Sequence, residues 1–160
     1  MRDHVDPTLL PGLELMPSLD LTDESLPAIR EGMEQMSALV PEPEGTGVVW
    51  REESVPAEGG RAIRVRIYTP AGADGRQLPA ILHIHGGGYV LGSVQTNHGS
   101  NILLAAATEA TIVSVDYRLA PETPAPGSVE DCYAALRWLH DNAARLGVDA
   151  ARIAIRGESA

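Results

Sequence analysis

Three short apolar runs separated by helical patterns constrain the fold of this chain most strongly. The runs cover residues 79–85, 110–117 and 152–156, and the first two are almost continuously apolar. Such continuity is typical of strands that are buried on both faces of a parallel sheet. Helical patterns at 97–109 and 128–146 lie between these runs. We therefore predict parallel βαβ units with right-handed crossovers.

The second of these helices carries start and stop signals. Ser128 and Asp131 stand three residues apart, which resembles a capping box at a helix N-terminus. Gly147 follows the last apolar position and is expected to end the helix. The apolar stripe consists of Val129, Cys132, Tyr133, Leu136, Leu139, Ala143 and Leu146.

Upstream of these units, a period of two residues predicts an antiparallel pair of strands. Residues 48–55 read as one strand, and residues 62–68 alternate apolar residues with arginine, as in a half-buried outer strand. Residues 57–60 contain two glycines and favour a hairpin turn. The predicted fold class is α/β, with a mostly parallel sheet, antiparallel outer strands and helices on both faces.

The N-terminal residues 1–45 are expected to form a separate unit in front of this core. Residues 1–25 read as an irregular arm, and Pro41 to Gly45 end the helix that follows it. Its apolar face consists of Leu26, Ile29, Met33, Met36 and Val40. We favour core packing for the two methionines; an adaptable lid surface is the alternative.

Charge and cysteine content exclude several function classes. The net charge is -10, from 22 acidic and 12 basic residues, so we predict neither nucleic-acid nor membrane-surface binding. Cys132 is the only cysteine, which rules out an internal disulfide and a cysteine metal site. Residues 1–15 lack the pattern of a secretory signal, and no apolar run approaches a membrane span. We expect a cytoplasmic protein.

Two short motifs follow predicted strands. Gly157-Glu158-Ser159-Ala160 matches the start of a Gly-x-Ser-x-Gly nucleophile elbow, although a surface-loop serine would explain the tetrapeptide taken alone. His85-Gly86-Gly87-Gly88 follows a buried strand, where glycines let backbone amides approach a substrate.

Two alternatives for the glycine loop receive less weight. A phosphate site would need the Lys-Ser/Thr of a Walker motif or the acidic residue of a dinucleotide fold, and neither pattern is present. His83 and His85 share a strand face and could bind a metal, but no third ligand stands at suitable spacing. We therefore predict neither a metal nor a cofactor.

Four stretches occur together in one order: residues 83–93, 116–122, 131–136 and 152–160. Together they resemble the hormone-sensitive-lipase family of bacterial carboxylesterases and lipases, which has the α/β-hydrolase fold. The resemblance implies an N-terminal portion of that fold. Residues 46–160 would be a partial core that ends at the elbow, and residues 1–45 would be an arm with a cap-type helix.

The resemblance also implies a role for each matching residue. Ser159 would be the nucleophile, and the oxyanion-hole amides would be those of Gly87, Gly88 and Ala160. His85 and Gly86 would order the loop, and His85 would not be the general base.

Residues 116–122 would buttress the site, with Arg118 and Glu122 in structural roles. Tyr89 and Glu158 stand where the family commonly has Phe and Asp, and would change only the rim of the pocket.

The implied activity is hydrolysis of small to medium acyl esters through an acyl-enzyme, with a small-molecule substrate and no cofactor. The triad acid and histidine of the family lie downstream of the serine. We expect His98 and His140 to be solvated or capping residues, unable to substitute for that histidine. The 160-residue chain alone is therefore expected to be inactive.

The nucleophile strand would then be an unpaired apolar edge, and we expect weak stability or aggregation of the chain alone. A homodimer is left open. A non-catalytic ligand-binding protein on the same fold is the alternative function, and amides or lactones are alternative substrates.

Overall fold

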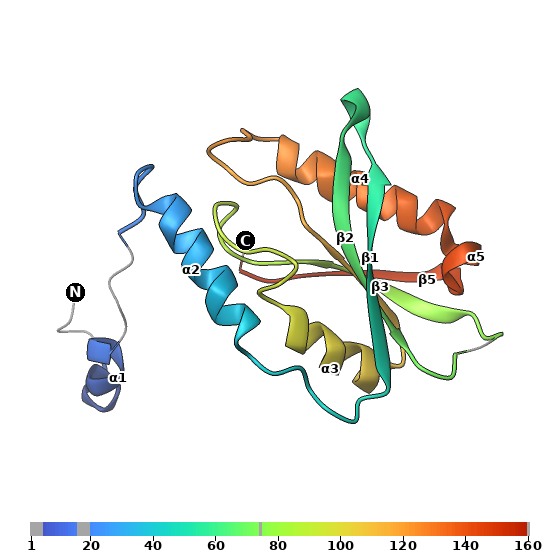
Figure 1. Ribbon diagram of the computed structural model, residues 1–160, viewed down its shortest axis with the longest axis horizontal. Helices are drawn as coiled ribbons and strands as arrows, with labels where there is room; N and C mark the ends of the chain where they lie inside the picture. Colours follow the sequence, from blue (N-terminus) through green and yellow to red (C-terminus); the bar gives the residue numbers. More distant parts are fainter. Residues whose placement is uncertain (1–4, 16–19, 74, 160) are drawn as a thin grey trace.

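The computed structural model describes residues 5–15, 20–73 and 75–159 (Figure 1). The strands are β1 (Val48–Pro56), β2 (Ala62–Pro70), β3 (Leu78–Ile84), β4 (Thr111–Val115) and β5 (Val148–Gly157). The α-helices are α1 (Leu10–Leu15), α2 (Leu26–Ala38), α3 (His98–Thr108), α4 (Gly127–Asp141) and α5 (Ala143–Leu146). Two short 3-10 helices are η2 (Pro7–Leu9) and η3 (Glu58–Gly60).

The strands form one five-stranded sheet in the order β1-β2-β4-β3-β5. β4, β3 and β5 are parallel neighbours, whereas β1 and β2 form an antiparallel pair that joins the sheet antiparallel to β4. The predicted α/β class, with a parallel centre and an antiparallel outer pair, is confirmed.

Helices cover both faces of the sheet. α4 and α5 lie on one side and α3 lies on the other (Figure 1). The larger core packs Ala135 and Leu139 of α4 against Leu82 and Val113 of the sheet. The smaller core packs Ile102 of α3 on the opposite face. Apolar burial on both faces explains why the runs in β3 and β4 are continuous rather than alternating.

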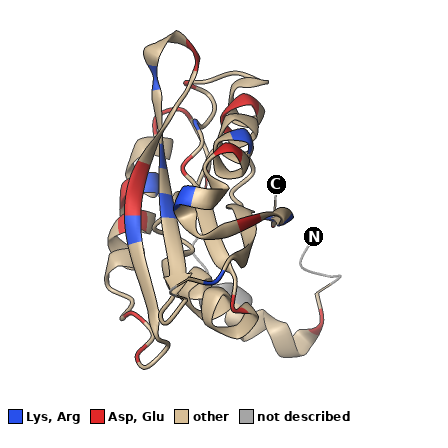
Figure 2. Cartoon of the chain, turned by 90° about the vertical axis from the view of Figure 1, so that its right-hand side faces the viewer, with Lys and Arg blue, Asp and Glu red and all other residues tan. Residues whose placement is uncertain are grey.

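The β1–β2 hairpin is more deeply buried than its alternating sequence predicts. Arg66 is only 5% exposed, and Ile67 and Tyr68 after it are fully buried, so the expectation of a half-buried strand is wrong for this part of β2. Glu52 faces Arg66 across the hairpin, and their side chains pair at 2.7 Å. Figure 2 shows acidic and basic residues side by side along the hairpin. The buried guanidinium is thus compensated by a cross-strand carboxylate.

The N-terminal segment differs from expectation in two ways. The arm predicted as irregular contains η2 and α1, and Asp6 caps η2 by accepting a hydrogen bond from the Thr8 amide at 2.9 Å. The helix predicted from residue 26 is confirmed as α2, but Met36 is 67% exposed. Core packing is therefore wrong for Met36.

The predicted start of α4 is also wrong. The helix begins at Gly127 after Pro126, and no side chain caps it. Asp131 instead turns toward the core, is 1% exposed, and accepts hydrogen bonds from Arg118 Nε at 2.7 Å and Arg61 Nη1 at 3.1 Å. A salt-bridged carboxylate gains more from two guanidinium groups than from one backbone amide. The predicted long helix is split at Asn142 into α4 and α5.

β5 lies at the edge of the sheet in the described part of the chain, where it pairs with β3. Ile155 on this strand is 58% exposed. The expectations of weak stability and aggregation stay predictions. Within the described residues, no helix combines the length and the apolar character needed to cross a membrane.

Asp131 should contribute measurably to stability. Burial alone would raise the pKa of Asp131, but hydrogen bonds from Arg118 and Arg61 outweigh burial and hold the pKa below its usual value. We expect Asp131→Asn to lower the free energy of unfolding at pH 7 by about 2 kcal/mol, since hydrogen bonds to charged groups contribute about 1.5–3 kcal/mol. Denaturant unfolding of the full-length protein measures this loss.

The pH dependence gives a second readout. Because the folded-state pKa is depressed, the contribution of Asp131 is present above about pH 4 and is lost as the pH falls below that value. Stability of Asp131→Asn should therefore decline less between pH 5 and pH 3. Glu130→Gln is the control, because Glu130 is 62% exposed and lies 3.8 Å from Arg118. Equal losses in the two variants would contradict the prediction.

Candidate active site

The two sequence motifs meet at one edge of the sheet because the strands that carry them are neighbours. β3 and β5 run parallel, and Ile84 pairs with Gly157 at their carboxyl ends. From there the chain leaves β3 through Gly86 and β5 through Ser159. The crevice outside the carboxyl ends of parallel strands is the usual ligand site of open α/β sheets.

Ser159 occupies a sharp turn directly after β5. Its φ is +49°, and the residue is exposed. A non-glycine residue in this left-handed region costs roughly 1–2 kcal/mol. Strain of this kind, on an exposed serine after a strand, is similar to the backbone geometry that a nucleophile elbow requires.

The glycine loop packs directly against this turn. A Cβ added to Gly86 would lie 2.6 Å from the carbonyl oxygen of Glu158 and 3.0 Å from Cβ of Ser159. Gly87 has φ +127°, and an added Cβ would collide with the carbonyl of Leu91. Gly88 has φ +59° and open space around it. Packing thus requires the first two glycines, whereas the third faces an opening.

The backbone amides of Gly87 and Gly88 point at one oxygen atom. They donate to the carbonyl oxygen of Ser159 at 3.2 and 3.3 Å. Two fixed donors on one carbonyl oxygen can stabilise negative charge at that point. Ala160, the third predicted donor, lies outside the described residues.

His85 is held inside the glycine loop. The side chain is buried, and its ring stacks on Tyr117 with centroids 4.1 Å apart. Nδ1 donates to the carbonyl of Gly86 at 2.9 Å, and Tyr117 Oη donates to the carbonyl of His85 at 2.7 Å. Burial lowers the pKa of His85, because desolvation disfavours the charged ring. This geometry can order the loop.

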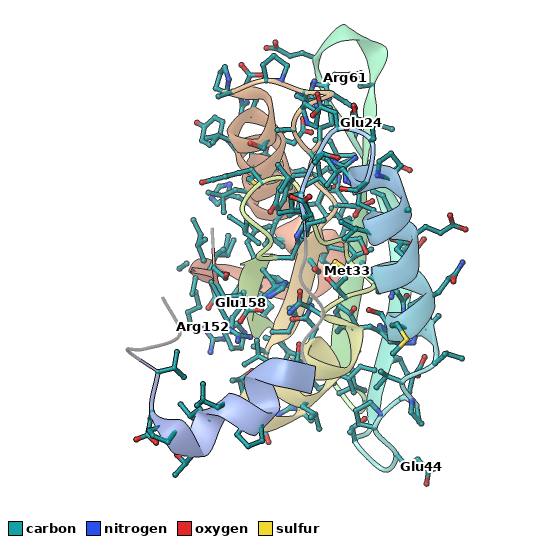
Figure 3. All side chains as sticks on the ribbon, turned by 90° about the vertical axis from the view of Figure 1, so that its left-hand side faces the viewer. Glu24, Met33, Glu44, Arg61, Arg152 and Glu158 are labelled. Carbon is teal, nitrogen blue, oxygen red and sulfur yellow. The ribbon has the colours of Figure 1, made fainter. Side chains whose placement is uncertain are left out.

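Glu158 and His83 form a support for the elbow that the motifs do not predict. Glu158 accepts a hydrogen bond from Asn97 Nδ2 at 2.7 Å, and its carboxylate lies 3.8 Å from Nε2 of His83 (Glu158 is labelled in Figure 3). His83 is fully buried, with Nδ1 within 3.1 Å of Ser114 Oγ and 3.3 Å of Asn101 Nδ2. The sequence contained one signal of this support. His83 stands in the middle of an apolar strand, and a buried polar group needs hydrogen-bond partners.

His98 differs from expectation, whereas His140 does not. His98 is buried, and its Nδ1 lies 3.0 Å from both Tyr68 Oη and Arg66 Nη1. Its Nε2 lies 3.0 Å from Glu42. The prediction that His98 is solvated or capping is therefore wrong, because it completes a buried polar cluster. His140 is 63% exposed, as predicted.

The segment 116–122 is joined to α4 and to α2 by ion pairs and to the residue after the glycine loop by a backbone hydrogen bond. Arg118 pairs with Asp131, and Glu122 pairs with Arg30 of α2 at 2.7 Å. The Ala120 amide donates to the carbonyl of Tyr89 at 2.9 Å. Among the residues that the structure describes, no three His, Cys, Asp or Glu side chains are grouped closely enough to hold a metal ion.

Comparison with known proteins gives a consistent set of matches. The model of a family described as having the alpha/beta hydrolase fold matches residues 81–160. Esterase LipI of Mycobacterium tuberculosis is 36% identical over 99% of this chain, which covers 49% of that protein. Carboxylesterase NlhH of the same species is 37% identical, with the same coverage. The chain spans about half the length of the curated relatives it matches.

Solved structures agree. An esterase from Pyrobaculum calidifontis superposes with a TM-score of 0.80 at 40% identity over 97% of this chain and 49% of the esterase. Esterase LipW from Mycobacterium marinum gives a TM-score of 0.83 at 39% identity, covering 97% of this chain and 48% of its own.

His83, beneath the site, should stay neutral at physiological pH. Burial lowers the pKa of His83 to about 4, helped by the nearby Arg156 charge and opposed by Glu158. The histidine ring NMR signals of the full-length protein should therefore show no inflection for His83 between pH 5.5 and pH 8. His83→Gln assigns its signal. An inflection near pH 6.5, the usual histidine value, would contradict this expectation.

Proposed function

The chain belongs to the α/β-hydrolase-fold family, and on this premise we propose that the full-length protein is a serine carboxylesterase of the hormone-sensitive-lipase type. The proposed substrates are small to medium acyl esters. Support comes from relatives named esterase or carboxylesterase along nearly the whole of this chain.

One observation carries the proposal. The amides of Gly87 and Gly88 converge on a single carbonyl oxygen beside a strained, exposed serine. In a complex with an ester, the acyl oxygen would take the place that the Ser159 carbonyl has here. Each such donor is worth about 3 kcal/mol of transition-state stabilisation in related chemistry. Ala160 is proposed as the third donor.

The proposed mechanism is covalent catalysis. Ser159 Oγ attacks the acyl carbonyl, its proton passes to a histidine, and the amides hold the oxyanion. The protonated histidine then gives its proton to the leaving alcohol, and an acyl-serine remains. Water attacks the acyl group with the same histidine as base, which releases the acid and regenerates the serine.

The base in this mechanism is not His83 or His85. In the described residues, no imidazole nitrogen lies within hydrogen-bond distance of Ser159 Oγ, and both strand histidines have their rings buried. We place the histidine and its acid downstream of the serine, in the order found in α/β-hydrolases.

Residues 1–45 are proposed to act as an arm and cap over residues 46–160. α2 lies beside the segment that contains the glycine loop (Figure 1). Met33 points from α2 toward the core (Figure 3) and lines a cavity of about 580 Å³ with Tyr117 and Leu119. A cytoplasmic location and a homodimer stay predictions, to be checked by cell fractionation and by light scattering.

Ser159→Ala should abolish turnover in the full-length protein. Removal of a serine nucleophile in a triad lowers kcat by up to about 10⁶-fold. Hydrolysis of a p-nitrophenyl acyl ester measures turnover, and mass spectrometry measures labelling of Ser159 by an organophosphonate. Ser54→Ala is the control, because Ser54 is an exposed serine on β1. Tight binding of an ester analogue without turnover or labelling would favour the non-catalytic alternative.

Gly86→Ala should separate the loop from the elbow, because the new Cβ would lie 2.6 Å from the Glu158 carbonyl oxygen. We expect kcat to fall about 10²-fold or more, as for loss of an oxyanion donor, with a smaller change in KM. Gly99→Ala is the matched control, since its Cβ would meet Pro43 at an ordinary 3.7 Å. Wild-type kcat in Gly86→Ala would show that the close approach is not required.

A further inference from the structure

Arg30 connects α2 to both segments that surround the glycine loop. Its Nε donates to the carbonyl of Val90 at 2.8 Å, and its Nη2 donates to the carbonyl of Ala120 at 2.6 Å. Nη1 and Nη2 also donate to the Glu122 carboxylate at 2.7 and 3.1 Å. Between described residues, every side-chain hydrogen bond from α2 to the rest of the chain comes from Arg30.

Two peptide groups connect the Val90 contact of Arg30 to the Gly88 amide, which is one of the proposed oxyanion-hole donors. The carbonyl of Val90 and the amide of Leu91 belong to one peptide, and that amide donates to the carbonyl of Gly87 at 2.9 Å. The carbonyl of Gly87 and the amide of Gly88 belong to the next peptide. The Gly88 amide then donates to the oxygen that marks the proposed oxyanion position.

The dipoles of the two peptide groups in this series are aligned. Each peptide accepts at its carbonyl and donates at its amide, so both positive ends point from Arg30 toward the oxyanion position. Hydrogen bonds in such a chain polarise one another, and the guanidinium charge at its start increases that polarisation. The series also fixes the plane of the Gly87–Gly88 peptide, which sets the direction of the Gly88 amide.

A second set of contacts holds the same loop from the other side. Ala120, whose carbonyl accepts from Arg30, donates its amide to the carbonyl of Tyr89 at 2.9 Å. The Arg30 side chain is 23% exposed, whereas the Glu122 side chain is 61% exposed. An exposed ion pair contributes little, so the two carbonyl contacts carry the connection. A planar guanidinium can serve these acceptors together, which a lysine ammonium cannot do in the same geometry.

We propose that Arg30 is a positioning residue for the oxyanion hole, acting on the Gly88 amide through the Val90–Leu91 and Gly87–Gly88 peptides. The proposal rests on the proposed esterase function. It assigns α2 a role in transition-state stabilisation in addition to covering the site.

The test compares ligands that differ in charge at the oxyanion position. A trifluoromethyl ketone forms a tetrahedral adduct with the serine and places an oxyanion in the hole, whereas the matching methyl ketone binds without one. We expect Arg30→Met in the full-length protein to lower the affinity for the trifluoromethyl ketone about 10-fold or more, because part of the stabilisation by one oxyanion donor is lost. The affinity for the methyl ketone should fall less than about 3-fold. The value of kcat should fall with the adduct, and KM should change little.

Glu122→Gln is the matched control, because it removes the exposed partner and leaves both carbonyl contacts of Arg30. It should keep wild-type affinity for both ketones. Arg30→Gln is the second variant and decides the test if Arg30→Met does not fold by circular dichroism. Equal weakening of both ketones in the arginine variants would overturn the proposal and leave Arg30 as a purely structural contact of the cap.

The failure of the esterase proposal would look different. In that case the wild-type protein would form no adduct, and its affinity for the trifluoromethyl ketone would equal that of Ser159→Ala.

Discussion

The parallel pairing of β3 with β5 is the constraint on which the candidate site depends. β3 lies between β4 and β5, so its position is fixed by hydrogen bonds on both sides. The pair ends with Ile84 opposite Gly157. Two residues further along, Gly86 after β3 and Ser159 after β5 lie against each other. The contact between Gly86 and the elbow is close enough that a single added carbon would collide with backbone. Register alone therefore brings the serine to the amides.

Three buried polar residues carry a cost in stability. His83, Asn101 and Thr111 are fully or almost fully buried, and each has a polar atom without a hydrogen-bond partner among the described residues. An unsatisfied buried polar atom is destabilising by about 1–3 kcal/mol. Such groups are expected where a fold holds a functional geometry rather than maximal stability. His83 and Asn101, which contact each other near the carboxyl end of β3, agree with that interpretation. Thr111 does not, because it begins β4 at the opposite end of the sheet.

The sequence predicts those parts of the fold that depend on local periodicity. Continuous apolar runs identified β3 and β4, and a period of two identified the hairpin, because burial on one or two faces leaves these patterns directly. Several of the predictions that failed concern charged and polar side chains with distant partners. Asp131 looked like a capping residue until Arg118 and Arg61 were brought beside it, and His98 looked solvated until Arg66, Tyr68 and Glu42 surrounded it. Spacing along the chain contains no information about such partners.

The same limit applied to the site. Motifs predicted the serine and the glycines, because a strained turn after a strand and a close approach of backbone amides recur with the same residue types. Arg30 carried no motif, since its partners are two backbone carbonyls about 60 and 90 residues away. α2 buries a single residue, Leu26, so apolar burial contributes little to holding this helix in place. Arg30 therefore provides the polar connection between α2 and the segments around the glycine loop, although no spacing along the chain marks it.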